Sequence, residues 1–143
     1  MNPKDFLAVA MFLSKGSSEA AIRSLVSRAY YAMLIYIREI MVNELHIQFL
    51  DGQNIHEWIP RYLKYSQLPD AKDLSKKIND FRDMRNCADY DMIQKFTEMD
   101  KLWLQRSEKI IAHFDKLDKR KLQAGILTYL RIISEPKRNE PES

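Results

Sequence analysis

Apolar side chains recur every three or four positions along most of this 143-residue chain, which is the spacing of an amphipathic helix. The pattern predicts an all-α bundle and shows no internal repeat. A loop is expected over residues 49–54, where Asp51-Gly52 is the turn signal. The expected helices cover about residues 5–15, 19–44, 55–65, 69–88, 97–117 and 122–133.

Residues with known capping preferences mark several helix ends. Gly16 offers a left-handed exit from the first helix, and one of the two serines after it can cap the second. Pro69 suits the first turn of the fourth helix. Thr97 and Asp100 resemble a capping box for the fifth. The apolar stripe of that fifth helix is expected to include Met99, Leu102, Trp103, Ile110, Phe114 and Leu117.

The helix expected over residues 19–44 is apolar on two faces. A helix that is apolar nearly all round is normally covered from both sides. We therefore expect it at the centre of the fold or at a subunit interface. One face carries Ile22, Leu25, Val26, Ala29, Met33, Tyr36, Ile37 and Ile40, and the other carries Tyr31, Leu34, Ile35 and Val42.

Composition narrows the class of protein. We expect residues 1–120 to form one helical domain, residues 121–133 an amphipathic C-terminal helix, and residues 134–143 a disordered tail. Three glycines and five prolines disfavour a β-sandwich or a Gly-rich phosphate loop. A single cysteine excludes a disulfide framework and a thiolate cluster for zinc.

The net charge permits an anionic partner, and the hydropathy pattern predicts no membrane-spanning segment. The formal net charge is +3, from 23 basic and 20 acidic residues. The longest apolar run, residues 29–37, is too short to span a bilayer, and the N-terminus does not resemble a signal peptide. We expect a cytoplasmic protein. His46, His56 and His113 lack metal-ligand spacing, so no metal and no other cofactor is expected.

An arginine lies where the fourth helix should be apolar. Leu74, Ile78 and Phe81 are four and three residues apart, and the same period leads on to Arg85. At 100° per residue, Arg85 lies about 20° from the direction of Leu74. A buried arginine keeps its charge and requires a carboxylate, a carbonyl or a phosphate. Asp89, one turn later, lies on the same side.

A second arginine, Arg28, lies on the second face of the long helix with Tyr31. Two inward guanidinium groups beside tyrosine hydroxyls would form a positive cleft, and arginine binds phosphate through paired hydrogen bonds. In the simpler alternative, Arg85 pairs with Asp89 and Arg28 pairs with an acid near solvent. The basic run 116–121 is likewise either an RNA contact or, as we favour, a solvated helix end.

The segments around both arginines resemble motifs of the HEPN family of α-helical domains. Residues 27–32, Ser-Arg-Ala-Tyr-Tyr-Ala, resemble the second-helix signature of one prokaryotic branch. Residues 85–91, Arg-Asn-Cys-Ala-Asp-Tyr-Asp, are similar to the later Arg-x-x-Ala-Asp-Tyr segment of that branch. His56, between the two, also fits. The resemblance covers roughly residues 3–118.

The resemblance implies a four- or five-helix bundle that forms a two-fold dimer with its site in the cleft between protomers. Many members are metal-independent ribonucleases used as toxins or in antiviral defence. Others bind nucleotides or are inactive partners of a small nucleotidyltransferase. The ribonuclease motif is an arginine, a polar residue and, after four to six intervening residues, a histidine. Arg85 and Asn86 match its first half, and Tyr90 stands where the histidine could be.

This departure bears on catalysis. Cleavage of RNA through its own 2′-hydroxyl needs a base and an electrophile for the developing charge. Arg85 suits the electrophile, whereas a tyrosine, with an ordinary pKa of about 10, is a poor base at pH 7. Asp89 is a substitute. On this resemblance the catalytic candidates are Arg85, Asp89 and Tyr90, and the phosphate- or RNA-binding candidates are Arg28, Tyr31, Arg85 and Asn86.

Two hypotheses follow from the sequence. The leading one is a homodimer whose cleft binds RNA or a nucleotide and is a candidate endoribonuclease, with a nucleotidyltransferase as a candidate antitoxin partner. The competing one is a non-catalytic dimeric interaction module in which the arginines are paired internally. The apolar second face of the long helix would then dock a partner protein.

Overall fold

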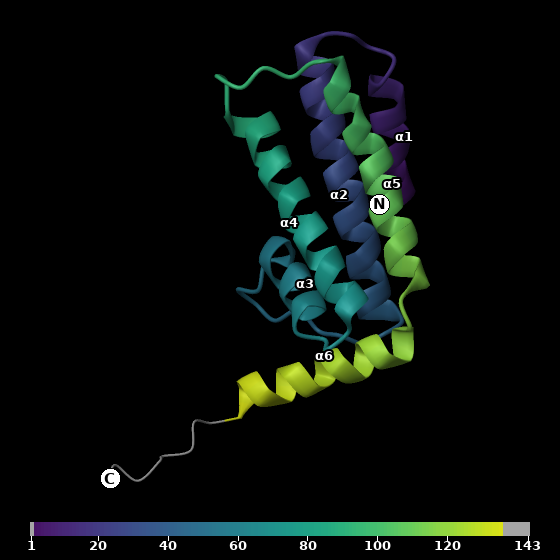
Figure 1. The fold of residues 1–143 in the computed structure, drawn as a ribbon, viewed down its shortest axis with the longest axis vertical. Helices are drawn as coiled ribbons and strands as arrows, with labels where there is room; N and C mark the ends of the chain where they lie inside the picture. Colours follow the sequence, from purple (N-terminus) through teal and green to yellow (C-terminus); the bar gives the residue numbers. More distant parts are fainter. Residues whose placement is uncertain (1, 136–143) are drawn as a thin grey trace, which may run out of the picture.

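The computed structural model describes residues 2–135, and all regular structure in this part of the chain is helical (Figure 1), which confirms the all-α prediction. Residues 136–143 of the expected disordered tail lie outside the described residues. The helices are α1 (Pro3–Leu13), α2 (Glu19–Asn43), α3 (Ile55–Lys64), α4 (Pro69–Tyr90), the 3-10 helix η1 (Glu98–Lys101), α5 (Leu102–Lys116) and α6 (Lys119–Ser134).

Side-chain caps set several helix starts. The Ser18 hydroxyl accepts a hydrogen bond from the Ala21 N–H at 3.1 Å, and α2 begins at the next residue. The Asn54 side chain accepts from the Glu57 N–H at 3.0 Å at the start of α3. Both starts agree with the sequence pattern.

The prediction for the end of the first helix was wrong. Gly16 was expected to leave the helix in a left-handed conformation, but α1 ends at Leu13 and the glycine lies beyond it. Among the described glycines, the positive φ of 85° belongs to Gly52, in the predicted turn between α2 and α3. Left-handed backbone is therefore found at Gly52, and at His46 and Gln67 after α2 and α3, rather than at Gly16.

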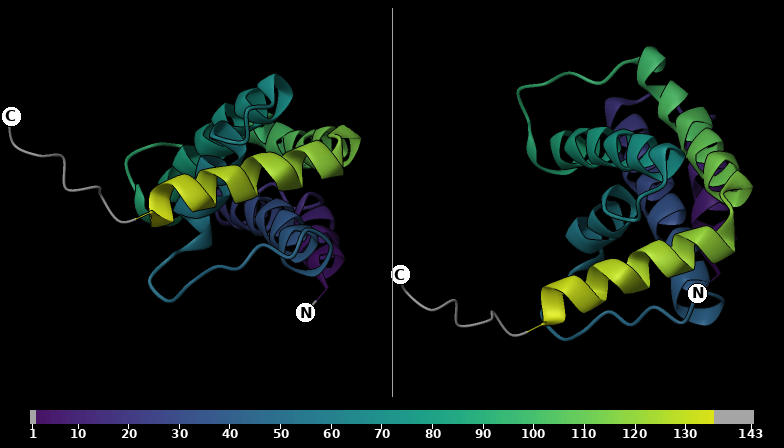
Figure 2. Two further views of the ribbon diagram at one scale, coloured as in Figure 1. Left: turned by 90° about the horizontal axis from the view of Figure 1, so that it is seen from below. Right: turned by 60° about the horizontal axis from the view of Figure 1, so that its bottom comes forward.

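α2 is the centre of the bundle. It packs against α1, α3, α4 and α5, so most of its apolar side chains are covered within one chain, although Val42 on the second face is 37% exposed (Figures 1 and 2). This confirms the prediction of a central helix. The buried side chains of α2 are Ile22, Leu25, Val26, Ala29, Tyr30, Ala32, Met33, Leu34, Ile37 and Met41.

The start of the fifth predicted helix differs from the pattern at one residue. Met99 was expected on the buried stripe, but its side chain is 78% exposed. Asp100 accepts a hydrogen bond from the Thr97 N–H at 2.8 Å, and the turn it closes is the 3-10 helix η1. A 3-10 turn has about three residues instead of 3.6, so Met99 leaves the face that α5 buries.

α6 lies across the lower end of the bundle, over the ends of α2 and α3 (Figure 2). The Gln123 side chain donates to the Leu45 carbonyl at 2.9 Å, and the Tyr129 ring stacks on Tyr65 with centroids 4.9 Å apart. Gly125 lies so close to Ser66 that an added Cβ would stand 1.8 Å from the Ser66 carbonyl oxygen. The C-terminal helix therefore packs on its own chain.

Candidate functional site

Arg85 lies on the buried face of α4, as the apolar period predicts. Leu74, Ile78 and Phe81 are fully buried below it, and Arg85 itself is only 7% exposed. Its Cζ lies 5.1 Å from the ring centroid of Tyr30 and 5.3 Å from that of Tyr31, both on α2. The two aromatic faces help to hold a cation in a site that water hardly reaches.

The polar partners of Arg85 are few and distant for a buried guanidinium. Nη1 lies 3.5 Å from Asp89 Oδ2, and Nη2 lies 3.4 Å from His56 Nδ1. Strong charge-assisted hydrogen bonds are about 2.7–2.9 Å long. Nε is buried and has no hydrogen-bond partner in the described part of the chain. Arg85 thus retains capacity for a further acceptor.

His56 enters the site from the first turn of α3. Its Nδ1 lies 2.8 Å from the Tyr30 hydroxyl oxygen, and its ring stacks on the Tyr30 ring at 5.6 Å with an interplanar angle of 11°. Nε2 makes no hydrogen bond within residues 2–135 and is not buried there. One ring nitrogen is therefore held by the Tyr30 hydroxyl, and the other has no partner within residues 2–135.

Burial and neighbouring cations determine the protonation of this cluster. Desolvation lowers the pKa of His56, and the positive charges of Arg85 and Arg82 lower it further. Burial raises the pKa of Tyr30 to about 12, although Arg85 and Arg82 oppose the shift. At neutral pH the imidazole and the phenol are both neutral, and the guanidinium carries the charge.

A hollow of about 300 Å³ opens beside Asp89, on the side of Arg85 away from His56. Ser27 Oγ donates to Asp89 Oδ2 at 3.3 Å. Arg28 was expected to point inward but is exposed, because its position on α2 faces the open side of this hollow rather than α4. The hollow is lined by Arg23, Ser24, Ser27, Arg28, Ala88 and Asp89.

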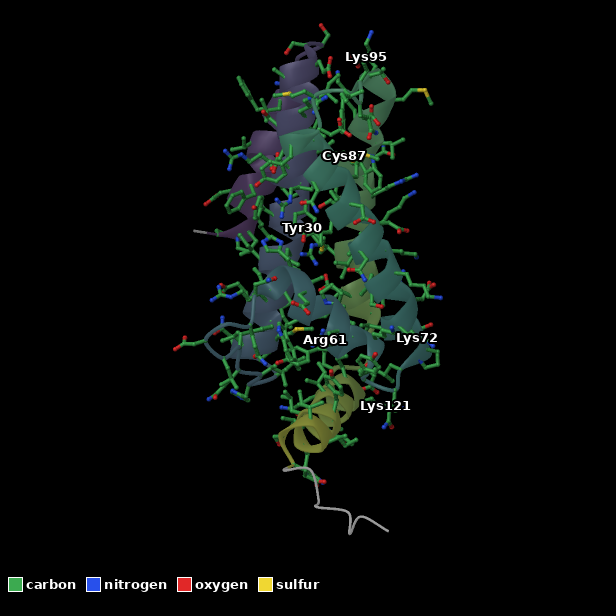
Figure 3. All side chains as sticks on the ribbon, turned by 90° about the vertical axis from the view of Figure 1, so that its left-hand side faces the viewer. Tyr30, Arg61, Lys72, Cys87, Lys95 and Lys121 are labelled. Carbon is green, nitrogen blue, oxygen red and sulfur yellow. The ribbon has the colours of Figure 1, made fainter. Side chains whose placement is uncertain are left out.

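A second hollow, of about 240 Å³, lies between α3 and α4 on the other side of His56. Arg82 connects the two regions, because its Nη1 donates to the His56 carbonyl at 3.4 Å. The face in Figure 3 shows Cys87, Tyr30 and Arg61 one below the other along this line. The second hollow is lined by Glu57, Pro60, Arg61, Lys64, Tyr65, Asn79 and Arg82.

We call the arginines and lysine along this line the basic strip: Arg28, Arg85, Arg82, Arg61 and Lys64. Arg85 is its buried member and the others are wholly or partly exposed. Arg61 is also bound to Glu57 at 2.7 Å. Arg23, nearby, is held by the Cys87 and Ala88 carbonyls at the end of α4, at 3.0 and 3.1 Å.

Two of the sequence candidates lie apart from Arg85. Asn86 and Tyr90 are one and five residues further along α4, about 100° and 140° round the helix from Arg85. Both are exposed, Tyr90 by 75%, and they border a shallow hollow with Met92 and Ile93. The structure therefore groups Arg85, Asp89 and Tyr31, with Arg28 at the rim, and leaves Asn86 and Tyr90 on another face.

Sequence reasoning missed the role of His56, Tyr30 and Arg82 in this cluster. The sequence indicates His56 only as part of the family resemblance and predicts no contact to Arg85. The sequence offered one signal for His56: it lies at the start of an apolar helix, in the long segment between the two motifs. Tyr30 belongs to the same motif as Tyr31 but lies on the buried face, where an apolar period gives no hint of its hydroxyl contact.

The described residues form neither a metal-binding cluster nor a membrane-spanning helix. Residues 2–135 contain no group of three or more His, Cys, Asp or Glu side chains placed to hold a metal ion. Over the same residues, none of the helices has the length and apolar character needed to cross a bilayer.

Comparison with known proteins gives one distant relative. An uncharacterized protein of Methanocaldococcus jannaschii is 27% identical over 106 residues, a match that covers 64% of this chain and 64% of the relative. The chain thus spans less than two thirds of the relative that it matches. No family model matches the sequence. No solved structure matches it either.

Proposed function

We propose that this chain is a HEPN-type RNA-binding protein whose Arg85 cluster holds a backbone phosphate. The observation that carries the proposal is a guanidinium that is 7% exposed, has a buried Nε without a partner in residues 2–135, and makes only long contacts to Asp89 and His56. A buried charge with unused donors is costly unless a ligand completes it.

Phosphate suits this site better than a carboxylate side chain does. A tetrahedral anion with several acceptor oxygens can take hydrogen bonds from Nε and Nη2, the two donors on one edge of the guanidinium, at once. Asp89 reaches only Nη1, at 3.5 Å, and its side chain is 27% exposed. An incoming phosphate can therefore displace the Asp89 carboxylate toward solvent and the Ser27 hydroxyl.

The basic strip favours a polynucleotide over a mononucleotide. Arg28 lies on one side of Arg85, and Arg82, Arg61 and Lys64 lie on the other. Exposed cations along one line match the repeated charge of a nucleic-acid backbone.

Homodimerisation is part of the proposal. Tyr90, Met92 and Ile93 are 75%, 84% and 93% exposed at the end of α4 and in the segment after it. Contiguous exposed apolar side chains of this size favour a protein interface. Burial against a second copy would join two chains at the ends of their α4 helices. A toxin or defence role and a nucleotidyltransferase partner stay predictions of the resemblance.

The alternative is a non-catalytic interaction module. The Arg85–Asp89 contact at 3.5 Å is the internal pairing that this alternative expects, and the apolar patch could dock a partner. Neighbouring helices of the same chain cover part of the second face of α2, and Val42 on that face is 37% exposed. The buried Nε, unpartnered within residues 2–135, favours the phosphate site.

The experiment is a binding titration with a labelled single-stranded RNA of about twelve nucleotides, using wild-type protein and Arg85→Lys. Lysine keeps the charge but cannot form the two parallel hydrogen bonds of arginine. We expect binding by the wild type and a loss of about tenfold or more in the variant, the size of one charged hydrogen bond. Arg106→Lys on α5 is the matched control. Equal binding by Arg85→Lys and wild type would contradict the proposal.

A further inference from the structure

We infer that the hollow between α4 and α5 is a docking site for an acidic segment of a partner protein. The hollow has a volume of about 360 Å³ and includes no residue of the Arg85 cluster or the basic strip, so the inference does not depend on RNA binding. Lys77 in the hollow lies about 140° round α4 from Arg82, on another side of that helix. The lining residues are Lys77, Asp80, Trp103, Arg106, Lys109 and Ile110.

The floor of the hollow is apolar and belongs to the core. Trp103 and Ile110 of α5 are 7% and 4% exposed. Phe81 of α4 is fully buried next to the indole, with the two ring centroids 4.9 Å apart. Because core side chains are closely packed, this floor keeps its shape when a partner binds. The hollow therefore offers a fixed apolar surface below a charged rim.

Arg106 is held over the floor with its hydrogen-bond donors unused. Its Cζ lies 4.4 Å from the centroid of the Trp103 ring, so the guanidinium rests on the aromatic face. Among residues 2–135 its nitrogens have neither a hydrogen-bond partner nor an ion pair. A guanidinium on a ring still presents N–H groups at its edge, and two parallel N–H groups match the two oxygens of a carboxylate. Arg106 is therefore positioned to bind an acidic side chain.

Three cations converge on the hollow from two helices. Arg106 and Lys109 are three residues apart on α5, and Lys77 lines the hollow from α4. Within the described residues, Asp80 forms no ion pair although it lines the same hollow. Lys77 pairs with Asp73 at 3.7 Å, but the two side chains are 54% and 62% exposed, and such a pair contributes little. Like charges on one helix face repel, so an anion bound here would relieve the repulsion.

A protein segment with carboxylates suits the hollow better than RNA does. RNA binding uses cations that follow a backbone, whereas these three surround one recess with an apolar floor. Asp80 repels a phosphodiester but can accept a hydrogen bond from a peptide N–H. Tryptophan and arginine are also the side chains that often dominate the binding energy of protein interfaces, and here the two are in contact. We therefore expect two carboxylates, one on Arg106 and one on the lysines, with a large apolar side chain between them.

The test uses a synthetic peptide of about twelve residues, with a central phenylalanine flanked on both sides by glutamates. Trp58→Phe in the full chain leaves Trp103 as the single tryptophan, so a change in its emission reports on the hollow itself. We expect saturable binding with a dissociation constant of about 100 μM, weak because a short peptide loses conformational freedom. Glutamines in place of the glutamates should abolish binding, and alanine in place of the phenylalanine should weaken it about tenfold.

Single substitutions locate the binding site of the peptide. Arg106→Gln and Lys77→Gln should each weaken peptide binding about tenfold, the size of one charged hydrogen bond. Lys76→Gln is the matched control, because it removes the same charge from the neighbouring exposed position of α4 and should bind the peptide as the wild type does. All three side chains are exposed, so the variants should fold, and an unchanged midpoint of urea unfolding checks this. RNA binding should be the same in all of them.

The absence of a saturable change in Trp103 emission up to about 1 mM peptide would overturn the inference. Equal binding of the glutamine peptide would also overturn it, and so would equal losses in Lys77→Gln and Lys76→Gln, which would show that only net charge matters. A loss of RNA binding in Arg106→Gln would make the hollow an RNA contact instead of a peptide site. Failure of the phosphate site at Arg85 would leave this inference standing.

Discussion

Arg85 is held by neighbours that only partly satisfy it. Two aromatic rings lie near 5 Å from its Cζ, at 5.1 and 5.3 Å, and its two polar contacts are 3.4 and 3.5 Å long. Such an arrangement keeps the guanidinium in place without using all of its donors. In this account Asp89 is a temporary partner that a phosphate replaces.

Asp89→Asn tests this view of the residue. Removal of the competing carboxylate should tighten RNA binding by about fivefold, since a partly exposed ion pair contributes up to about 1 kcal/mol. The same change should lower the free energy of unfolding by up to about 1 kcal/mol, because Arg85 loses its carboxylate. RNA titration and urea unfolding measure the two effects, with Asp83→Asn as the exposed control on α4. Weaker RNA binding by Asp89→Asn would mean that the carboxylate helps to hold the ligand.

His56 should make stability depend on pH. Its pKa in the folded chain lies below the ordinary value of 6.5, so the unfolded chain binds the proton more readily. Its contribution to the free energy of unfolding is therefore complete above pH 6.5 and is lost as the pH falls through the folded pKa. Urea unfolding between pH 7.5 and pH 5 should show a smaller loss of stability in His56→Asn than in the wild type. Equal losses would contradict the shift.

The sequence predicts the position of some site residues correctly and of others not. The burial of Arg85 followed from the period of Leu74, Ile78 and Phe81, because a helix repeats its face regularly. The inward direction expected for Arg28 did not hold, since a residue between two apolar faces can point to the open side. The contact of His56 was not predictable, because the approach of α3 to α4 depends on a loop with no period.

At the scale of elements, α4 carries the site and α3 extends it. α4 supplies Arg85, Asp89 and Arg82, and α3 supplies His56 at its start and the lower cations at its end. Five of the helix positions expected from the pattern agree with the structure to within a few residues. The 3-10 start at η1 was not anticipated, because apolar spacing does not distinguish a 3-10 turn from an α-turn.

The lower end of the basic strip should matter only for longer RNA. Lys64→Glu should weaken the binding of a twelve-nucleotide RNA and reduce the slope of log affinity against log salt by about one. Binding of a dinucleotide, which reaches only the Arg85 cluster, should not change. Fluorescence anisotropy at several salt concentrations measures both. The control is Lys109→Glu on α5. An equal effect of the two variants would contradict the proposal that the basic strip binds RNA.

At the scale of the molecule, the proposed function depends on residues at the surface of the bundle rather than on its core. In the core, α2 packs against four helices of its own chain and α6 closes the lower end (Figures 1 and 2). Tyr90, Met92 and Ile93, which are among the most exposed apolar side chains, lie beyond Arg85 at the end of α4. The sequence pattern did not predict this exposed cluster, because residues at and beyond the end of a helix are not part of its repeating apolar face.

Sedimentation tests the dimer. The wild type at micromolar concentration should sediment as a species near twice 17.0 kDa. Ile93→Glu should yield a monomer, because it places a charge among the most exposed apolar side chains, whereas Ile132→Glu on α6 should remain a dimer. A monomeric wild type, or an Ile93→Glu protein that stays dimeric, would contradict this interface.

The most direct test of the central claim is the NMR signal of the Arg85 Nε–H group. Its burial should slow exchange with water enough for the proton to be seen, and its absence in Arg85→Lys assigns it. On titration with a dinucleoside phosphate, a hydrogen bond from Nε to the phosphate should move this resonance downfield in proportion to occupancy. A ligand that shifts other resonances while the Arg85 signal stays in place would contradict the account.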